Sequence, residues 1–393
     1  MSRRSEPVGG RLLPTGGRWM LALVALAAII LGWRFAVGLG PTTAMSDGYP
    51  WGLWIAFDVV TGTALACGGY AVAILVYILN RGKYHPLVRS ALVTSALGYT
   101  MGGLAVVIDL GRWWNVPKLP FFLWEWNLDS ILLEVAVCIM LYTMVLWIEL
   151  SPAFLERWRE GAEGRLRSFA VRATPLVKKA LPWLIALGLL LPTMHQSSLG
   201  TLMFLAGPRL HPLWATPMLP LLFLVSCIGM GYGVVILESI MAGRAFDRPI
   251  ERPQLAGLTR PVMLTMILFV VVRFVDMGLR GRLGMAFALD GYSVLFLLEN
   301  ALFLFPALYL LGSRRQRRLG SLVRGAGVLL LAGALYRFST FLIAFQPGQS
   351  WTYFPALPEV LVTLGLVSFE VLAYTLIVKR FPILQGAPAP ARS

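Results

Sequence analysis

About ten long apolar stretches, with acidic and basic residues inside them, constrain this chain more than any other feature. A helix that crosses a lipid bilayer needs roughly 20 mostly apolar residues. Of the 393 residues, 58% are hydrophobic and only 13% are charged. A soluble domain of this length could not hide so much apolar surface. We therefore expect an all-α membrane protein, and a functional reason for each charge inside a span, because such charges are costly there.

The apolar stretches predict ten transmembrane helices in a single integral membrane domain, 1–393. The spans cover approximately 19–39, 51–79, 87–110, 128–149, 176–195, 213–240, 258–278, 287–312, 321–345 and 356–379. Residues 1–18 form an N-terminal tail and residues 381–393 a C-terminal tail. An even number of spans places both tails on the same side of the membrane.

Basic residues in the loops predict the orientation. The net charge of +15 is gathered in alternate loops, a pattern that fixes membrane topology and argues against nucleic acid as a partner. The more basic side holds both tails, with Arg3 and Arg4, and the Arg314–Arg318 loop. It also holds a long hydrophilic loop with Arg157, Arg159, Arg165, Arg167, Arg172, Lys178 and Lys179. This side is expected to be cytoplasmic. The opposite side is rich in Trp, which suits an interfacial belt or a docking face for another subunit.

Two short patterns recur and predict an internal repeat. Asp109 to Arg112 ends the third span and Asp276 to Arg280 ends the seventh. The spans that follow them carry Ser130 to Glu134 and Ser293 to Glu299. Spans two to five (51–195) would then match spans six to nine (213–345) as parallel four-helix repeats, flanked by spans one and ten.

Ionisable and polar residues inside the spans are the candidates for chemistry. The rise of 1.5 Å per helical residue sorts them by depth. The outer half holds Asp58, Asp109, Arg112, Glu134, His195, Arg273, Asp276 and Arg337, the middle Tyr99, Glu299 and Glu370, and the cytoplasmic end Glu149 and Glu238. Proton paths are built from such groups. A structural interpretation stays open, because Asp109 with Arg112, and Arg273 with Asp276, could neutralise each other within one helix.

His195 is expected where the fifth span meets the outer interface. An imidazole beside amide and hydroxyl groups can hydrogen-bond a quinone carbonyl and pass on a proton. The alternative is a histidine that caps the backbone carbonyls of a helix end.

Histidine and cysteine placement argues against haem and metal in this chain. His85 falls on the cytoplasmic side, whereas His195 and His211 fall on the other side, so a bis-histidine haem is not expected. The three cysteines, Cys67, Cys138 and Cys227, all lie inside apolar spans without a C-x-x-C pair. We interpret them as packing residues rather than as metal ligands or disulfides.

Four motifs resemble a known family. Pro50–Asp58 is similar to the opening of the NrfD/PsrC family of integral membrane subunits. The stretches 80–89, 108–115 and 191–198 resemble, more narrowly, the HybB-type membrane subunits of hydrogenase-2 type NiFe-hydrogenases. The resemblance runs from about Gly9 to Pro382.

The resemblance implies a haem-free subunit that binds quinone near the outer face of the membrane. Members exchange electrons with a periplasmic, ferredoxin-like iron–sulfur subunit, which connects to a catalytic subunit outside the membrane. A buried glutamate in the fourth helix of HybB-like members is implicated in proton movement, and Glu134 matches that position. Leu133 replaces the aromatic residue expected before it, which is a minor departure.

Together these observations predict a bacterial inner-membrane subunit of a respiratory complex, most closely a NiFe-hydrogenase with its large and small subunits. The candidates for quinone binding, to menaquinone or ubiquinone, are His195, Asp109, Arg112 and Asp58, and those for proton transfer are Glu134, Tyr99 and Glu299. The catalytic centre would lie in another chain. The alternatives are a quinone subunit of a polysulfide- or sulfite-related oxidoreductase, a proton-coupled secondary transporter, or a passive anchor.

Overall fold

The computed structural model describes residues 5–14, 16–316 and 318–386. Within these ranges, ten helices are long and apolar enough to cross a membrane, and two isolated bridges are the only β-structure. The prediction of an all-α protein with ten spans is confirmed. Arg3, Arg4, Arg317 and the end of the predicted C-terminal tail lie outside the described residues.

Most spans are single α-helices. Seven of the ten are α1 (Gly17–Val37), α6 (Ile131–Gly161), α7 (Gly164–Leu205), α8 (Leu219–Ala245), α9 (Arg252–Leu279), α11 (Gly291–Tyr309) and α14 (Leu357–Arg380). The third span joins the 3₁₀-helix η3 (Gly82–Leu87) to α4 (Val88–Asp109), and the ninth joins α13 (Leu319–Phe338) to the π-helix η7 (Ser339–Ile343).

The second span is broken, although the sequence predicted one continuous helix over 51–79. It consists of the π-helix η1 (Trp54–Thr61), α2 (Gly62–Leu65), α3 (Gly68–Ala73) and the π-helix η2 (Ile74–Ile78). The helix is interrupted at Ala66 and Cys67, both of which are buried. Irregular backbone at membrane depth is tolerated where protein covers it. Here α8 covers it. Gly231 of α8 lies so close to the break that a Cβ on this residue would be 2.5 Å from the carbonyl oxygen of Cys67.

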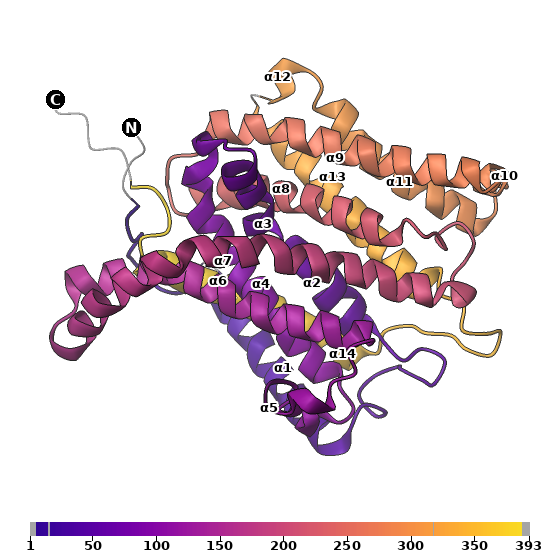
Figure 1. Cartoon of the computed structure of the whole chain (residues 1–393), viewed down its shortest axis with the longest axis horizontal. Helices are drawn as coiled ribbons and strands as arrows, with labels where there is room; N and C mark the ends of the chain where they lie inside the picture. Colours follow the sequence, from indigo (N-terminus) through magenta and orange to yellow (C-terminus); the bar gives the residue numbers. More distant parts are fainter. Residues whose placement is uncertain (1–4, 15, 317, 387–393) are drawn as a thin grey trace.

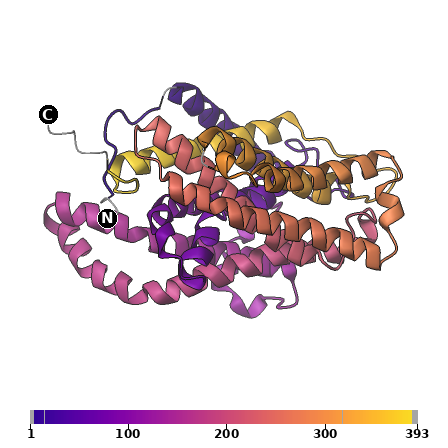
Figure 2. The ribbon, with the colours of Figure 1, turned by 90° about the horizontal axis from the view of Figure 1, so that it is seen from above.

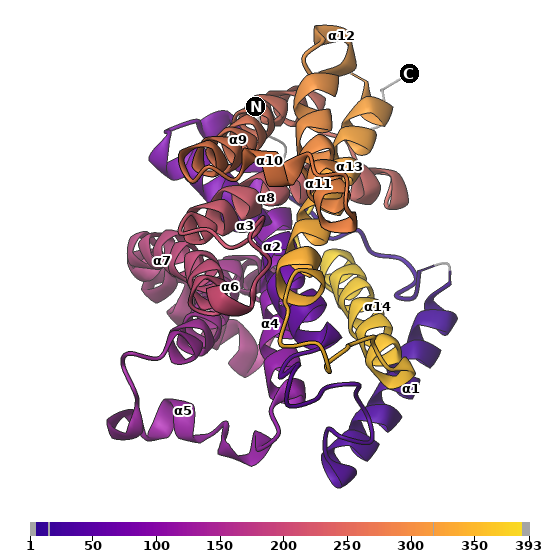
Figure 3. The same cartoon turned by 90° about the vertical axis from the view of Figure 1, so that its right-hand side faces the viewer.

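The spans form two groups of four and a flanking pair (Figures 1 and 3). The second span, α4, α6 and α7 contact one another in a ring, and α8, α9, α11 and α13 do the same. The groups meet where α8 packs on α2, α3 and α7. The remaining two spans, α1 and α14, pack on each other, and α14 also contacts α4. This arrangement agrees with two four-helix units, while their internal symmetry stays a prediction.

The predicted hydrophilic loop between the fourth and fifth spans is instead helical. α6 continues to Gly161 and α7 begins at Gly164, so only two residues separate them. The two helices project as a hairpin beyond the rest of the bundle (Figures 1 and 2). Apolar stretches mark only the part of a helix that lies in lipid, so the hydropathy pattern ends before these helices do.

The first and last described segments of the chain lie at one end of the bundle, which we call the terminal end (Figure 1). The segment after Ser5 runs beside the C-terminal segment, with a bridge between Ser5 and Gln385 and a hydrogen bond of 2.9 Å from Glu6 N to Leu384 O. The opposite, far end carries the loops that follow α1, α4, α7, α9 and α13. Its connection from α4 to α6 contains η4 (Trp113–Asn115), α5 (Lys118–Phe121) and η5 (Leu123–Glu125), and it projects sideways in Figure 3.

Candidate functional site

A buried polar network lies where the two four-helix units meet, around His195 of α7. His195 is fully buried, and its Nε2 lies 3.1 Å from the hydroxyl of Thr63. Gln196 donates from Nε2 to the same hydroxyl oxygen at 3.1 Å. The other ring nitrogen, His195 Nδ1, is buried with no hydrogen-bond partner among the described residues. The histidine therefore has one nitrogen free to bond a further group.

The sequence predicted His195 at the end of a helix, but the structure places it inside α7. α7 continues for ten residues beyond it, to Leu205, which is about 15 Å at the helical rise. The alternative role as a helix cap is therefore wrong. The prediction failed because the apolar stretch stops near His195, while the polar residues that follow it, such as Gln196 and Ser198, are buried against other helices.

Arg337 of α13 places a positive charge at the centre of this network. Its side chain is fully buried, and its guanidinium donates to Val60 O at 3.1 Å, to Gln196 Oε1 at 3.3 Å and to Ser226 Oγ at 3.2 Å. No carboxylate of the described chain lies within ion-pair distance of it. A buried cation held only by neutral dipoles is costly. It favours any negative charge that develops nearby.

Tyr99 of α4 lies on the other side of His195. The two rings meet edge to face, with centroids 5.7 Å apart, and Tyr142 contacts Tyr99 at 4.5 Å. The Tyr99 hydroxyl lies 3.6 Å from Cys67 Sγ, at the break in the second span. The structure thus brings together two predicted site residues, His195 and Tyr99, from two different helices.

Asp58 and Asp109 form no hydrogen bond or ion pair with His195, Tyr99 or Arg337 in the described part of the chain. Asp58, on the π-helix η1, is buried and accepts a hydrogen bond of 2.6 Å from Thr363 Oγ1 of α14. Asp109 is the last residue of α4, and Arg112 is exposed in the turn beyond it. No hydrogen bond or ion pair joins Asp109 to Arg112 in the described chain, so the predicted neutralisation within one helix is wrong.

Arg34 of α1 is the cation beside Asp109, and sequence reasoning missed it. Its buried guanidinium donates to Ile108 O at 2.7 Å and to Leu110 O at 2.6 Å, and it interacts electrostatically with Asp109. The signal was present in the sequence, because Arg34 is the only charged residue between 19 and 39.

Glu134 lies nearer to the end of its helix than the sequence predicted. α6 begins at Ile131, so Glu134 belongs to its first turn, and its side chain is half-buried. The expected depth assumed a helix that began at residue 128. Ser130 caps the helix by accepting a hydrogen bond from Leu133 N, and this cap sets the true start of the helix.

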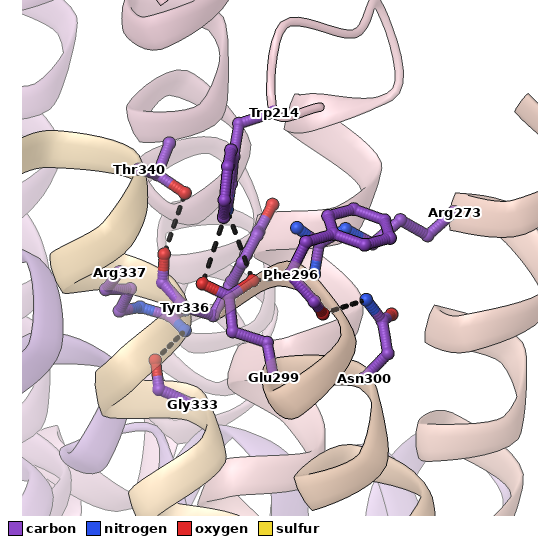
Figure 4. A network of polar contacts seen from close by, with 9 residues as sticks. All are labelled: Trp214, Arg273, Phe296, Glu299, Asn300, Gly333, Tyr336, Arg337 and Thr340. Carbon is purple, nitrogen blue, oxygen red and sulfur yellow. Dashed lines mark hydrogen bonds and ion pairs between the residues drawn. The ribbon is translucent and has the colours of Figure 1, made fainter. Parts of the chain in front are cut away.

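Glu299 of α11 forms the most buried ion pair of the described residues (Figure 4). Its Oε2 lies 2.9 Å from Nη1 of Arg273 of α9, and the two side chains are 0% and 3% exposed. The indole N–H of Trp214 donates to both carboxylate oxygens, at 3.3 and 3.2 Å. The alternative that Arg273 and Asp276 neutralise each other is wrong, because Asp276 pairs with Arg280, at 2.5 Å. Sequence spacing could not show the pair of Arg273 with Glu299, because it joins different helices.

The Glu299 cluster is linked to the central network through α13. Figure 4 shows Tyr336 beside Glu299, and Tyr336 directly precedes Arg337 in the chain. The guanidinium of Arg273 lies 5.2 Å from the centre of the Tyr336 ring. Arg273 Nη2, Tyr336 OH and Asn300 Oδ1 are buried without hydrogen-bond partners in the described chain. Such atoms are positions where ordered water binds.

The three histidines lie in separate parts of the structure. His85 lies in η3 at the terminal end, His195 is bonded to Thr63 inside the bundle, and His211 stacks on Tyr292 in a far-end loop, with ring centroids 4.3 Å apart. These surroundings share no residue, so no two histidine rings face one another. The described residues also contain no group of three or more His, Cys, Asp or Glu side chains that could hold a metal ion.

Comparison with known proteins identifies one family and several relatives. The model of the family described as "Polysulphide reductase, NrfD" matches residues 41–350. A protein of Escherichia coli (strain K12), named "Probable Ni/Fe-hydrogenase 2 b-type cytochrome subunit", is 39% identical over 389 residues, which cover 98% of this chain and 96% of that protein.

More distant relatives carry the names of other oxidoreductases. The "Menaquinone reductase, integral membrane subunit" of Nitratidesulfovibrio vulgaris is 27% identical over 69% of this chain and 66% of its own length. A subunit of the selenate reductase of Mesobacillus selenatarsenatis is 24% identical over 57% of this chain and 56% of its own length.

Proposed function

Since the chain belongs to the NrfD family, we propose that it is the multi-pass membrane subunit of a quinone-linked oxidoreductase in the bacterial inner membrane. The subunit exchanges electrons between an iron–sulfur subunit on the periplasmic side and membrane quinone. The similarity to a hydrogenase-2 subunit over almost the whole chain favours a NiFe-hydrogenase, with large and small subunits, as the complex. The menaquinone reductase relative supports quinone as the electron carrier.

The observation that carries this proposal is the central network of Arg337, His195 and Tyr99. A quinone that takes up electrons gains negative charge and then protons. The unpaired cation of Arg337 stabilises the charge, while an imidazole and a phenol can bond the oxygens and pass protons. A proton-coupled transporter would also use buried carboxylates, but it has no need of an iron–sulfur partner.

The predicted quinone residues fall into an inner and an outer pair. His195 and Asp58 are buried and suit the headgroup when it is fully bound. Asp109 and Arg112 lie at the far end, and they suit the path by which a quinone enters. The far end also carries Trp114, Phe121 and Trp124, which are 61%, 70% and 77% exposed. We assign this aromatic face to the iron–sulfur subunit, which must come within electron-transfer distance of the quinone.

Proton transfer is assigned to Tyr99, Glu299 and Glu134. Tyr99 contacts His195, and Glu299 joins the same region through Tyr336. Glu134, half-buried at a helix start, suits exchange with water at the far end. In Glu134→Gln we expect quinone binding and assembly to persist, while the membrane potential generated by reconstituted complex falls. A wild-type potential at wild-type turnover would remove Glu134 from the path.

The subunit is proposed to lack haem, although the name of one relative includes "b-type cytochrome". The separate surroundings of the three histidines are the reason, since a bis-histidine haem needs two that face a common space. A reduced-minus-oxidised spectrum of the purified subunit is expected to show no stoichiometric b-type band. Such a band would contradict the assignment.

Co-purification tests the whole proposal. A tagged subunit, solubilised in mild detergent, is expected to retain an iron–sulfur subunit and hydrogenase subunits, and the preparation is expected to reduce a quinone with hydrogen. Recovery of a different catalytic subunit, of the polysulfide or sulfite type, would keep the quinone function and replace the partner. Recovery of the chain alone from intact membranes, with no quinone reduction, would refute the proposal.

A further inference from the structure

α14 carries a line of polar side chains on one side: Glu359, Thr363, Glu370 and Tyr374. Their spacings of four, seven and four residues return to nearly the same direction on a helix with 3.6 residues per turn. The line extends over 15 residues, or about 22 Å, which is most of the roughly 30 Å hydrocarbon core of a bilayer. Thr363 and Tyr374 each bond a carboxylate on another span, so this side of α14 faces the protein.

Glu359, at the far end of the line, has a structural role. Its Oε1 accepts a hydrogen bond of 2.6 Å from the Tyr353 hydroxyl, and its Oε2 accepts bonds of 2.9 Å from Ala44 N and 2.8 Å from Ala356 N. These bonds hold the start of α14 against the loop after α1. All of these bonds are structural, so the part of the line considered for proton transfer begins at Thr363.

Asp58 is the first carboxylate inside that part. It is 7% exposed, and its Oδ2 accepts the 2.6 Å bond from Thr363 Oγ1. It lies in the π-helix η1, and π-helical turns occur frequently at functional sites. Because Asp58 is also a candidate for quinone binding, protons that reach it are close to the quinone.

Among the carboxylates that contact this line, Glu238 of α8 lies nearest the terminal end. The Tyr374 hydroxyl donates to its Oε1 at 2.8 Å. Its Oε2 is buried and interacts with the nearby Thr94 hydroxyl, although neither atom forms a hydrogen bond of good geometry among the described residues. Buried polar atoms of this kind are positions where water binds, and water is the carrier that links carboxylates too distant for direct transfer.

Glu370 lies between these two carboxylates and interacts electrostatically with both. It is seven residues from Thr363 and four from Tyr374, or about 10 Å and 6 Å along the helix. Gly98 of α4 lies beside its carboxyl group, since a Cβ on Gly98 would lie 3.5 Å from Glu370 Oε1. Both intervals are longer than a hydrogen bond, so proton transfer along this side of α14 requires water molecules between the carboxyl groups.

We propose that Glu238 and Glu370 form a proton route along α14 that connects the terminal end of the bundle to Asp58. The proposal rests on the proposed quinone function and deepens it. A quinone that receives two electrons from the iron–sulfur partner also takes up two protons and becomes the quinol. The route supplies these protons from the terminal side, while electrons arrive from the far side, so each turnover moves charge across the membrane.

The test uses the whole complex in proteoliposomes, with hydrogen as reductant, a quinone as acceptor and a potential-sensitive dye. The membrane potential generated per quinone reduced is the deciding quantity. In Glu370→Gln and in Glu238→Gln we expect it to fall at least tenfold, because an amide cannot carry a proton, whereas Glu370→Asp retains part of it. A wild-type value in both Gln variants would overturn the route.

A matched control variant and a second measurement test whether a lower membrane potential comes from the loss of the carboxyl group. Thr375, next to Tyr374, bonds only Val371 O of its own helix, so Thr375→Val is expected to keep the wild-type value. Infrared difference spectra on quinone reduction are expected to lose a carboxyl C=O band in Glu370→Gln, and an unchanged spectrum would argue against the route. If Glu370→Gln does not assemble, Glu238→Gln decides. A wild-type complex that reduces no quinone refutes the proposed function instead.

Discussion

Removing Arg273 tests whether the Glu299 ion pair is charged in the folded protein. Arg273→Met keeps much of the side-chain volume and leaves Glu299 with the indole N–H of Trp214 as its nearest donor. Both side chains of the pair are almost completely buried, at 3% and 0% exposure. A carboxylate left there without its cation cannot be solvated.

The expected loss of stability is large. Breaking one partner of a buried ion pair costs about 3–5 kcal/mol, which corresponds to a change of more than roughly 100-fold in the unfolding equilibrium constant. The cation–π contact of Arg273 with Phe296, at 4.0 Å, is lost as well. The double variant Arg273→Met with Glu299→Met is expected to lose less than either single variant, because it leaves no unpaired charge.

Unfolding in mixed micelles by titration with a denaturing detergent measures these differences. Lys118→Met is the matched control, because Lys118 and Glu125 form an ion pair of 3.5 Å whose side chains are 54% and 50% exposed. An exposed pair contributes about 0–1 kcal/mol. Equal losses in Arg273→Met and Lys118→Met, or additive losses in the double variant, would show that Glu299 is not a charged partner of Arg273.

Three further predictions concern separate parts of the molecule. His195→Ala is expected to reduce quinone-linked turnover without loss of assembly, and unchanged turnover and quinone affinity would remove His195 from the site. Gly231→Ala is expected to cost about 1–3 kcal/mol of stability by overpacking against Cys67, whereas Gly327→Ala, which has open space around it, is expected to stabilise α13 by up to ~1 kcal/mol. Burial lowers the pKa of His211 from its ordinary value of 6.5, so the unfolded chain binds the proton more readily, and stability is expected to fall as the pH drops below that value. The fall should be smaller in His211→Gln, and an identical pH profile would contradict the assignment.

The number of spans and the class of fold could be predicted from the sequence, because lipid demands long apolar helices. The interruption at Ala66 and Cys67 could not, since it depends on how closely α8 approaches at Gly231. The extension of α6 and α7 beyond the membrane also escaped prediction. Residues 150–175 are too polar to signal a span, yet they continue the helices that leave it.

The sequence could predict which residues belong to the site, but it could not predict which residues they contact. His195, Tyr99 and Glu299 were identified because polar groups inside apolar stretches are costly. Their contacts to Thr63, Cys67 and Arg273 join residues that are distant in the chain, so sequence spacing gives no sign of them. The same limit concealed Arg34, whose hydrogen-bond acceptors follow it by more than 70 residues.

The contact between α1 and α14 has a consequence for the order in which the protein is made. Ala27 and Gly365 meet so closely that a Cβ on Gly365 would lie 2.2 Å from that of Ala27, and the segment after Ser5 bonds to residues near 380. α1 is the first span to leave the ribosome and α14 is the last. The side of α1 that packs on α14 therefore stays uncovered in lipid until α14 has been synthesised. A chain that stops before α14 leaves α1 without its main packing partner.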